Sequence, residues 1–334
     1  MFFCGDYQME DVEYMKYLGD ILSMDGENVK NVASRKAKAW GSVRQILSIL
    51  EETCFGPYFF EMAMVLRSSL LLNSMLTNSE AWYGLTKSDI DELEDVDLFL
   101  MRKIFQVPFS CPKEIFYLET GCLPISYIIK SRRVMFLHSI LHEESDSMIY
   151  NFLQAQMENP VKGDWILDVK KNLEELKLNL KTEEIMVMSK MKFRKLVLEA
   201  VRSKAFGDLL ELKNSHKKVK HISYEHFEMQ KYLKSKSLSN QEAKFAFHLR
   251  SRMIDVRCNY SSSYSHLHCP LCKKSEDNQE HLLNCEKLAE EKVISNGEIN
   301  YQQLFERNIG KQEMVVKILK KSFENRKSIL MKEK

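Results

Sequence analysis

Residues 27–50 read ENVKNVASRKAKAWGSVRQILSIL, and they indicate the kind of protein that this chain forms. Their apolar residues mostly recur at three- and four-residue spacing, from Val29 and Val32 through Trp40 to Leu50. This spacing places them on one face of an α-helix and leaves the basic residues on its outer face. The stretch therefore predicts a long amphipathic helix packed on an apolar core.

The same periodicity continues through most of the chain. With only 11 Gly and 6 Pro among 334 residues, long helices are favoured over sheets and turns. Residues 10–23 differ, because they are β-branched and aromatic and precede the turn signal Met24-Asp25-Gly26, so we expect a short β-hairpin there. The predicted fold class is mainly α. Further helices are expected at 57–75, from 87 onward behind a Thr86 cap, and at 125–141, 146–157, 164–178, 182–212, 223–235 and 239–256.

Composition limits the environment in which this protein is expected to work. Eight cysteines in a Lys-rich chain of this length do not suit a disulfide scaffold, so we expect a reducing compartment. No run approaches the roughly 20 apolar residues of a membrane span, and the first residues lack the features of a signal peptide. We therefore expect a soluble intracellular protein, nuclear or cytoplasmic, without a membrane partner.

The net charge of +2 hides a strong segregation along the chain. Residues 1–189 carry 19 basic against 29 acidic residues, 190–257 carry 17 against 7, and 258–334 carry 13 against 11. Such asymmetry suggests that one part of the molecule faces a polyanion. The alternative is a solvated, Lys-rich helical surface that serves only solubility.

Residues 268–285, HCPLCKKSEDNQEHLLNC, contain the residues with metal chemistry. Cys269 and Cys272 are spaced so that a tight turn can direct both thiolates at one ion. His281 and Cys285 are four residues apart, which puts them on one face of a helix. Four such ligands leave no vacant position, so they predict a structural rather than a catalytic Zn²⁺ site. His266 and His268 are weaker candidates, since His268 adjoins Cys269, and the other cysteines are expected to be small buried hydrophobes.

Two other groups of chemically active side chains are interpreted as structural. The acidic run that includes Glu94, Asp95 and Asp97 is expected to be a solvated helix face rather than a cation site. His138 and His142 lie one helical turn apart and are expected to be core or surface residues rather than a metal pair.

An ordered set of short motifs covers nearly the whole chain. The stretches are YMKYLG (14–19), SMDG (23–26), SEAW (79–82), PKE (112–114), YLETG (117–121), LPI (123–125), IKSRR (129–133), NPVKGDW (159–165), FHLRSRM (247–253) and QEH (279–281). Together with the Cys-Cys-His-Cys cluster, this set resembles the C-terminal part of non-LTR (LINE-type) retrotransposon reverse transcriptases. The resemblance implies a palm-end β-hairpin remnant at 1–26, a thumb-like helical region at 27–145, a helical connecting region at 146–257, a CCHC zinc knuckle at 258–290 and a helical tail at 291–334.

The departures from that family decide the expected activity. A reverse transcriptase needs carboxylates that hold two Mg²⁺ ions, and in the family these include a tandem Asp-Asp that precedes the YLG hairpin. The sequence contains no tandem Asp-Asp, and no nuclease-like acidic pattern follows Cys285. We therefore expect no enzyme activity and no catalytic Mg²⁺ on this chain, although the parent family is an RNA-directed DNA polymerase.

Nucleic acid, RNA or DNA, is the expected partner if the resemblance holds, because thumb helices and zinc knuckles contact phosphates and bases. Tyr260 and Tyr264 could stack on bases, whereas Phe247 is expected in the core. The rival interpretation is a helical zinc-containing interaction or scaffold protein, or a relic without function. The candidate contacts are Lys30, Arg35, Lys36, Lys38, Arg44, Lys190, Lys192, Arg194, Lys195, His216, Lys217, Lys218, Lys220, Arg250, Arg252, Arg257, Lys273 and Lys274.

Overall fold

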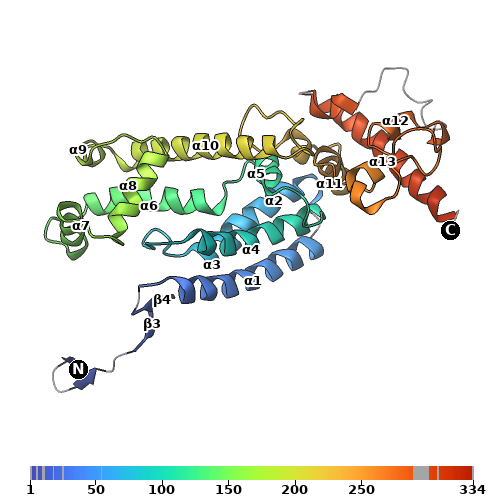
Figure 1. Ribbon diagram of the computed structural model, residues 1–334. Helices are drawn as coiled ribbons and strands as arrows, with labels where there is room; N and C mark the ends of the chain where they lie inside the picture. The colour runs from blue at the N-terminus through green and yellow to red at the C-terminus, as the bar shows by residue number, and fades with distance from the viewer. Residues whose placement is uncertain are drawn as a thin grey trace. The chain divides into compact units, whose positions relative to one another are not determined.

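The fold is mainly α-helical, as the sequence predicts (Figure 1). The computed structural model describes residues 2–4, 7–9, 12–17, 19–24, 26–53, 55–288, 301–306 and 308–332, the first two ranges by backbone alone. The side chains of Cys4 and Cys54, which were expected to be small buried hydrophobes, lie outside this description.

Short strands come first and helices follow to the end of the described chain. The strands pair as two antiparallel hairpins, β1–β2 and β3–β4. The elements are β1 Phe2–Cys4, β2 Tyr7–Met9, β3 Tyr14–Tyr17, β4 Asp20–Ser23, α1 Val29–Glu52, η1 Gly56–Tyr58, α2 Phe59–Leu66, η2 Arg67–Leu71, α3 Leu72–Leu76, α4 Lys87–Phe105, α5 Lys113–Thr120, α6 Ile125–Leu141, α7 Met148–Glu158, α8 Trp165–Glu175, α9 Thr182–Met186, α10 Lys190–Ser215, η3 Lys231–Lys234, α11 Asn240–Arg250, η4 Arg257–Ser263, α12 His281–Asn284, η6 Tyr301–Phe305 and α13 Ile309–Lys332.

The chain forms two compact units whose segments alternate along the sequence. Unit 1 contains residues 1–46, 66–100 and 123–207. Unit 2 contains residues 47–65, 101–122 and 208–334. The helices α1, α4 and α10 therefore each contribute residues to both units.

In unit 1 the predicted hairpin β3–β4 is present and is held to the start of α1. The Asn31 side chain accepts a hydrogen bond from the Ile21 amide at 3.2 Å, and the buried Arg35 forms an ion pair with Asp20 at 2.5 Å. Tyr14 and Tyr17 remain 53% and 58% exposed.

A buried ion pair links α4 to the π-helical turn η2 in unit 1. Arg67 donates to both carboxylate oxygens of Asp97, at 2.6 and 2.7 Å, and to the Leu123 carbonyl at 3.1 Å. The expectation that this acidic run is a solvated face is wrong for Asp97 and for Glu94, which are 0% and 7% exposed. Both lie on the inner face of α4, and Asp97 is stabilised there by its cation.

The core of unit 2 is built around stacked aromatic rings. Phe105 stacks on Phe60 at 5.2 Å and on Phe247 at 4.1 Å between ring centroids, and Phe247 stacks on Phe116 at 5.6 Å. Phe247 is fully buried, which confirms its expected core position. Because these rings come from four separate helices, the stack holds distant parts of the sequence together.

The predicted helices agree with the structure except in three places, of which the first is that the helix predicted at 239–256 ends at Arg250. The 182–212 pattern divides into α9 and α10, and Ser189 accepts a hydrogen bond from the Lys192 amide at the start of α10. The helix predicted at 223–235 is wrong, since only η3 forms there. Its backbone instead bonds to the end of α5, where the Gln230 amide donates to the Glu119 carbonyl at 2.9 Å.

Among the described residues, one helical stretch, Gly56–Leu76, is long and apolar enough to cross a membrane, with a mean hydropathy of 1.2. Half of that window is buried within the protein. The sequence was expected to contain no run close to the length of a membrane span, and that expectation is wrong for this stretch. Glu61 and Arg67 interrupt its apolar residues, but its mean hydropathy stays high enough for a candidate span.

Candidate metal centre

A tight backbone hairpin brings the first two cysteines together. His268 and Glu276 form an antiparallel bridge, and the Cys269 amide donates to the Ser275 carbonyl at 2.7 Å. Lys273 adopts a left-handed conformation with φ of +59°, which lets the chain reverse between these bonds. Cys269 and Cys272 consequently lie on the same short loop with their thiols close together.

A single helical turn supplies the second pair of candidate ligands. The Asn278 side chain accepts a hydrogen bond from the His281 amide at 2.7 Å, so it caps the start of α12. The Cys285 amide donates to the His281 carbonyl at 2.8 Å. His281 and Cys285 are therefore one turn apart on the same face, as their spacing predicts.

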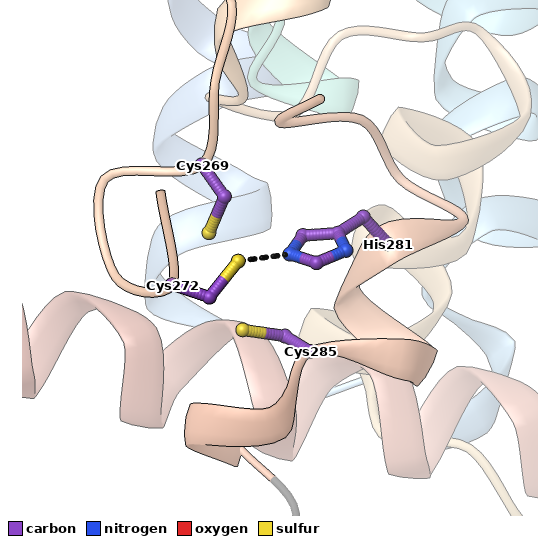
Figure 2. A group of neighbouring side chains, drawn as sticks. All are labelled: Cys269, Cys272, His281 and Cys285. Carbon is purple, nitrogen blue, oxygen red and sulfur yellow. Dashed lines mark hydrogen bonds between the residues drawn. The ribbon is translucent and has the colours of Figure 1, made fainter. Parts of the chain in front are cut away.

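The four side chains converge on one small space. Figure 2 shows the three sulfur atoms and the imidazole edge pointing toward one another. All four ligand atoms lie within 4.8 Å of one another, and Cys272 Sγ is 3.3 Å from His281 Nε2. A tetrahedral ion with bonds of about 2.0–2.3 Å separates its ligand atoms by roughly 3.5–3.8 Å. The group fits such an ion after small adjustments and could hold a metal. His266 and His268 are not part of it.

The local electrostatics differ between the two thiols of the loop. Burial raises the pKa of the Cys269 thiol to about 11, helped by the neighbouring Cys285 and Cys272. At Cys272 burial acts in the same direction, but the backbone N–H groups of Lys274 and Ser275 outweigh it and lower the pKa. Backbone donors aimed at a sulfur favour the thiolate, which is the form that binds a metal.

Buried polar side chains fasten this loop to the rest of unit 2. Asp277 is fully buried, pairs with Arg326 of α13 at 2.6 Å and accepts from the Arg257 amide at 2.9 Å. Gln279, also fully buried, donates to the Leu249 carbonyl at 2.9 Å. Sequence reasoning missed both residues, because nothing in their spacing separates them from an ordinary polar loop.

Comparison with known proteins found no match for this chain. No family model, curated protein or solved structure matches it. What this chain does must therefore be argued from its own residues.

Two of the basic residues predicted to contact nucleic acid lie in the interior. Arg35 and Arg250 are each 3% exposed. Arg35 pairs with Asp20, while Arg250 pairs with Glu119 at 2.9 Å and donates to the Leu304 carbonyl at 3.0 Å. Their guanidinium groups stabilise the fold, so neither is available to a phosphate, and both are removed from the candidate contacts.

The remaining candidates are accessible, although several already have an acidic partner. Lys36 pairs with Glu92, Arg252 with Glu280 and Lys274 with Glu286. Pairs of this kind at the surface are worth little and exchange readily with a phosphate. Those in unit 1 are Lys30, Lys36, Lys38, Arg44, Lys190, Lys192, Arg194 and Lys195, and those in unit 2 are His216, Lys217, Lys218, Lys220, Arg252, Arg257, Lys273 and Lys274.

Proposed function

We propose that this chain binds nucleic acid through a surface of unit 2 that a structural zinc ion holds in shape. The observation that carries the proposal is the Cys269, Cys272, His281 and Cys285 group, whose loop itself carries basic residues. Three sulfurs and one imidazole are the donors of structural zinc sites, and four protein ligands leave no position for a substrate. Zinc would thus rigidify the loop rather than perform chemistry.

Cations and aromatic rings alternate beside this centre. The Arg257 guanidinium lies 5.4 Å from the Tyr264 ring centroid and donates to the His268 carbonyl at 3.1 Å. The Lys218 ammonium lies 5.2 Å from the Tyr260 ring centroid. Tyr264 is exposed and Tyr260 is half-buried. Rings next to cations suit single-stranded nucleic acid, whose bases stack on the rings while its phosphates contact the charges. We refer to Lys218, Arg257, Tyr260, Tyr264 and Lys273 as the knuckle surface.

The order of motifs supports a more specific origin. It resembles the thumb, connecting region and zinc knuckle of non-LTR retrotransposon reverse transcriptases, in which polymerase carboxylates lie elsewhere. Under this proposal the chain grips template RNA or target DNA and catalyses nothing itself. A helical scaffold that binds only proteins is the rival, and a failure to bind nucleic acid would favour it.

The metal is tested by native mass spectrometry of the purified full chain. We expect one zinc per chain, lost on Cys269→Ser combined with Cys285→Ser because two of the four ligands disappear. Cys258→Ser is the matched control, since Cys258 lies nearby but outside the ligand group, and it should retain the ion. A wild-type protein without bound metal would refute the zinc assignment.

Nucleic-acid binding is tested by fluorescence anisotropy with a single-stranded RNA and a single-stranded DNA of mixed sequence. Affinity should fall steeply between about 50 and 200 mM salt, because each phosphate contact releases a counterion. Arg257→Gln with Lys273→Gln should weaken binding, whereas removing the exposed charges of Glu143 and Glu144, which do not belong to the knuckle surface, should not. Absence of binding even at about 50 mM salt would refute the proposal.

A further inference from the structure

Unit 1 contains a cavity of about 570 Å³ that the proposed function does not use. Its lining comes from α3 and the turn after it, from α6 and from the first turn of α10. The volume falls in the range of sites that bind small organic ligands, roughly 300–1,000 Å³. The question is which ligand its chemistry would select.

Arg132 of α6 is a half-buried cation that lines this cavity, and the acidic side chain that acts on its charge is Glu80. Its guanidinium donates to the Leu76 carbonyl and to the Ser79 hydroxyl, both neutral, and within the described part of the chain it forms no ion pair. Its neighbour Arg133 shows the usual arrangement, since it pairs with Asp168 at 3.5 Å. A half-buried guanidinium that no carboxylate contacts directly is stabilised by a bound anion.

Two further cations border the same cavity. Lys190 and Arg194 stand in the first turn of α10, both exposed and without an ion pair among the described residues. The positive end of this long helix adds to their potential. Against three cations, the one acidic side chain in the lining is Glu80.

Another part of the lining is apolar and includes Met135, Phe136 and Phe193. The Phe193 ring stacks on His138 at 4.8 Å, and His138 Nε2 is held 2.9 Å from the Met188 carbonyl. The cavity thus joins an anion-attracting side to a flat apolar wall that suits a planar ring.

We propose that this cavity binds a nucleoside phosphate, with the phosphate at Arg132, Lys190 and Arg194 and the base against Phe136 and Met135. The inference goes beyond the proposed function, because the metal centre and the knuckle surface belong to unit 2. A free mononucleotide and one nucleotide of a strand both present a phosphate and a base. The experiment below distinguishes these two ligands.

Isothermal titration calorimetry of the full chain with 5′-AMP is the test, with adenosine and inorganic phosphate as partial ligands. We expect saturable binding of one AMP, and at least about tenfold weaker binding of adenosine, because charge-assisted bonds to the phosphate are lost. Arg132→Gln should weaken AMP binding about tenfold or more. Lys190→Gln with Arg194→Gln provides a variant whose exposed positions leave the fold intact, and it should weaken binding several-fold.

Lys195→Gln is the matched control, since it removes one charge from the next position of α10, where the side chain is 79% exposed and does not line the cavity. It should bind AMP as the wild type does. Equal binding of AMP and adenosine, or binding that both cavity variants leave unchanged, would overturn the inference. A pentanucleotide that binds more tightly than AMP, and is weakened by the same variants, would identify the ligand as part of a strand; tighter AMP would identify a free nucleotide.

Discussion

Asp97 is a buried charge in unit 1 that Arg67 neutralises. Its carboxylate is fully buried and accepts two hydrogen bonds from Arg67, which is itself 3% exposed. Asp95, two positions earlier on the same helix, is exposed. Identical side chains on α4 therefore have opposite roles, and the difference is set by which face of the helix each occupies.

Asp97→Asn should destabilise the protein by about 3–5 kcal/mol, because it leaves the Arg67 charge buried without its counter-ion. Urea unfolding followed by circular dichroism measures this change. Asp95→Asn is the control and should change the free energy of unfolding by less than about 0.5 kcal/mol. Equal effects of the two substitutions would contradict the assigned role of the buried pair.

Gly121 ends α5 by a backbone conformation that other residues adopt poorly. Its φ is +67°, and its amide donates to the Tyr117 carbonyl at 2.8 Å, which closes the helix. A Cβ here would lie 2.6 Å from the Glu228 Cα, on the segment that bonds to the end of α5. The close approach of these two backbones thus requires glycine.

Gly121→Ala should destabilise unit 2 by more than the roughly 1–2 kcal/mol expected from a left-handed alanine alone. Gly84→Ala separates the two contributions, since its φ of +61° is similar and a Cβ there meets nothing within 4 Å. Thermal unfolding of both variants is the measurement. If Gly121→Ala destabilises the protein no more than Gly84→Ala does, the Glu228 backbone must be able to move away from the new Cβ without a loss of stability.

At the level of elements, periodicity and capping predicted most of the helices. The range of α6 was predicted to the residue, because Pro124 precedes it and Leu141 ends its apolar pattern. Thr86 caps α4 as expected, accepting a hydrogen bond from the Asp89 amide at 3.2 Å. The failure at 223–235 has a tertiary cause: Tyr224 and Tyr232 are buried, and the backbone there bonds to α5 instead of to itself.

The candidate site was predictable to a similar degree. Ligand spacing alone identified Cys269, Cys272, His281 and Cys285, since metal geometry constrains local sequence. The residues that hold the loop in place, Asp277 and Gln279, depend on partners far along the chain. The burial of Arg35 and Arg250 could not be foreseen either, because each is neutralised by a distant carboxylate.

For the whole molecule, metal removal should loosen the two units unequally. Treating the protein with a zinc chelator should raise amide hydrogen exchange in residues 267–288 and in α13, because Asp277 of the ligand loop pairs with Arg326 of α13. Exchange in α6 of unit 1 should stay at the level of the untreated protein. Uniform loss of protection across both units would contradict this expectation.

The alternation of segments also determines the order in which the protein can mature on a ribosome. Phe60 and Phe105 emerge early, yet Phe247, which stacks directly on Phe105, is made much later. At about 5–20 residues per second, Phe247 is added roughly 7–28 seconds after Phe105. During that interval the nascent chain carries unpaired aromatic surface while the segments of unit 1 are completed. We therefore expect the nascent chain to depend on chaperones until Phe247 joins the aromatic stack.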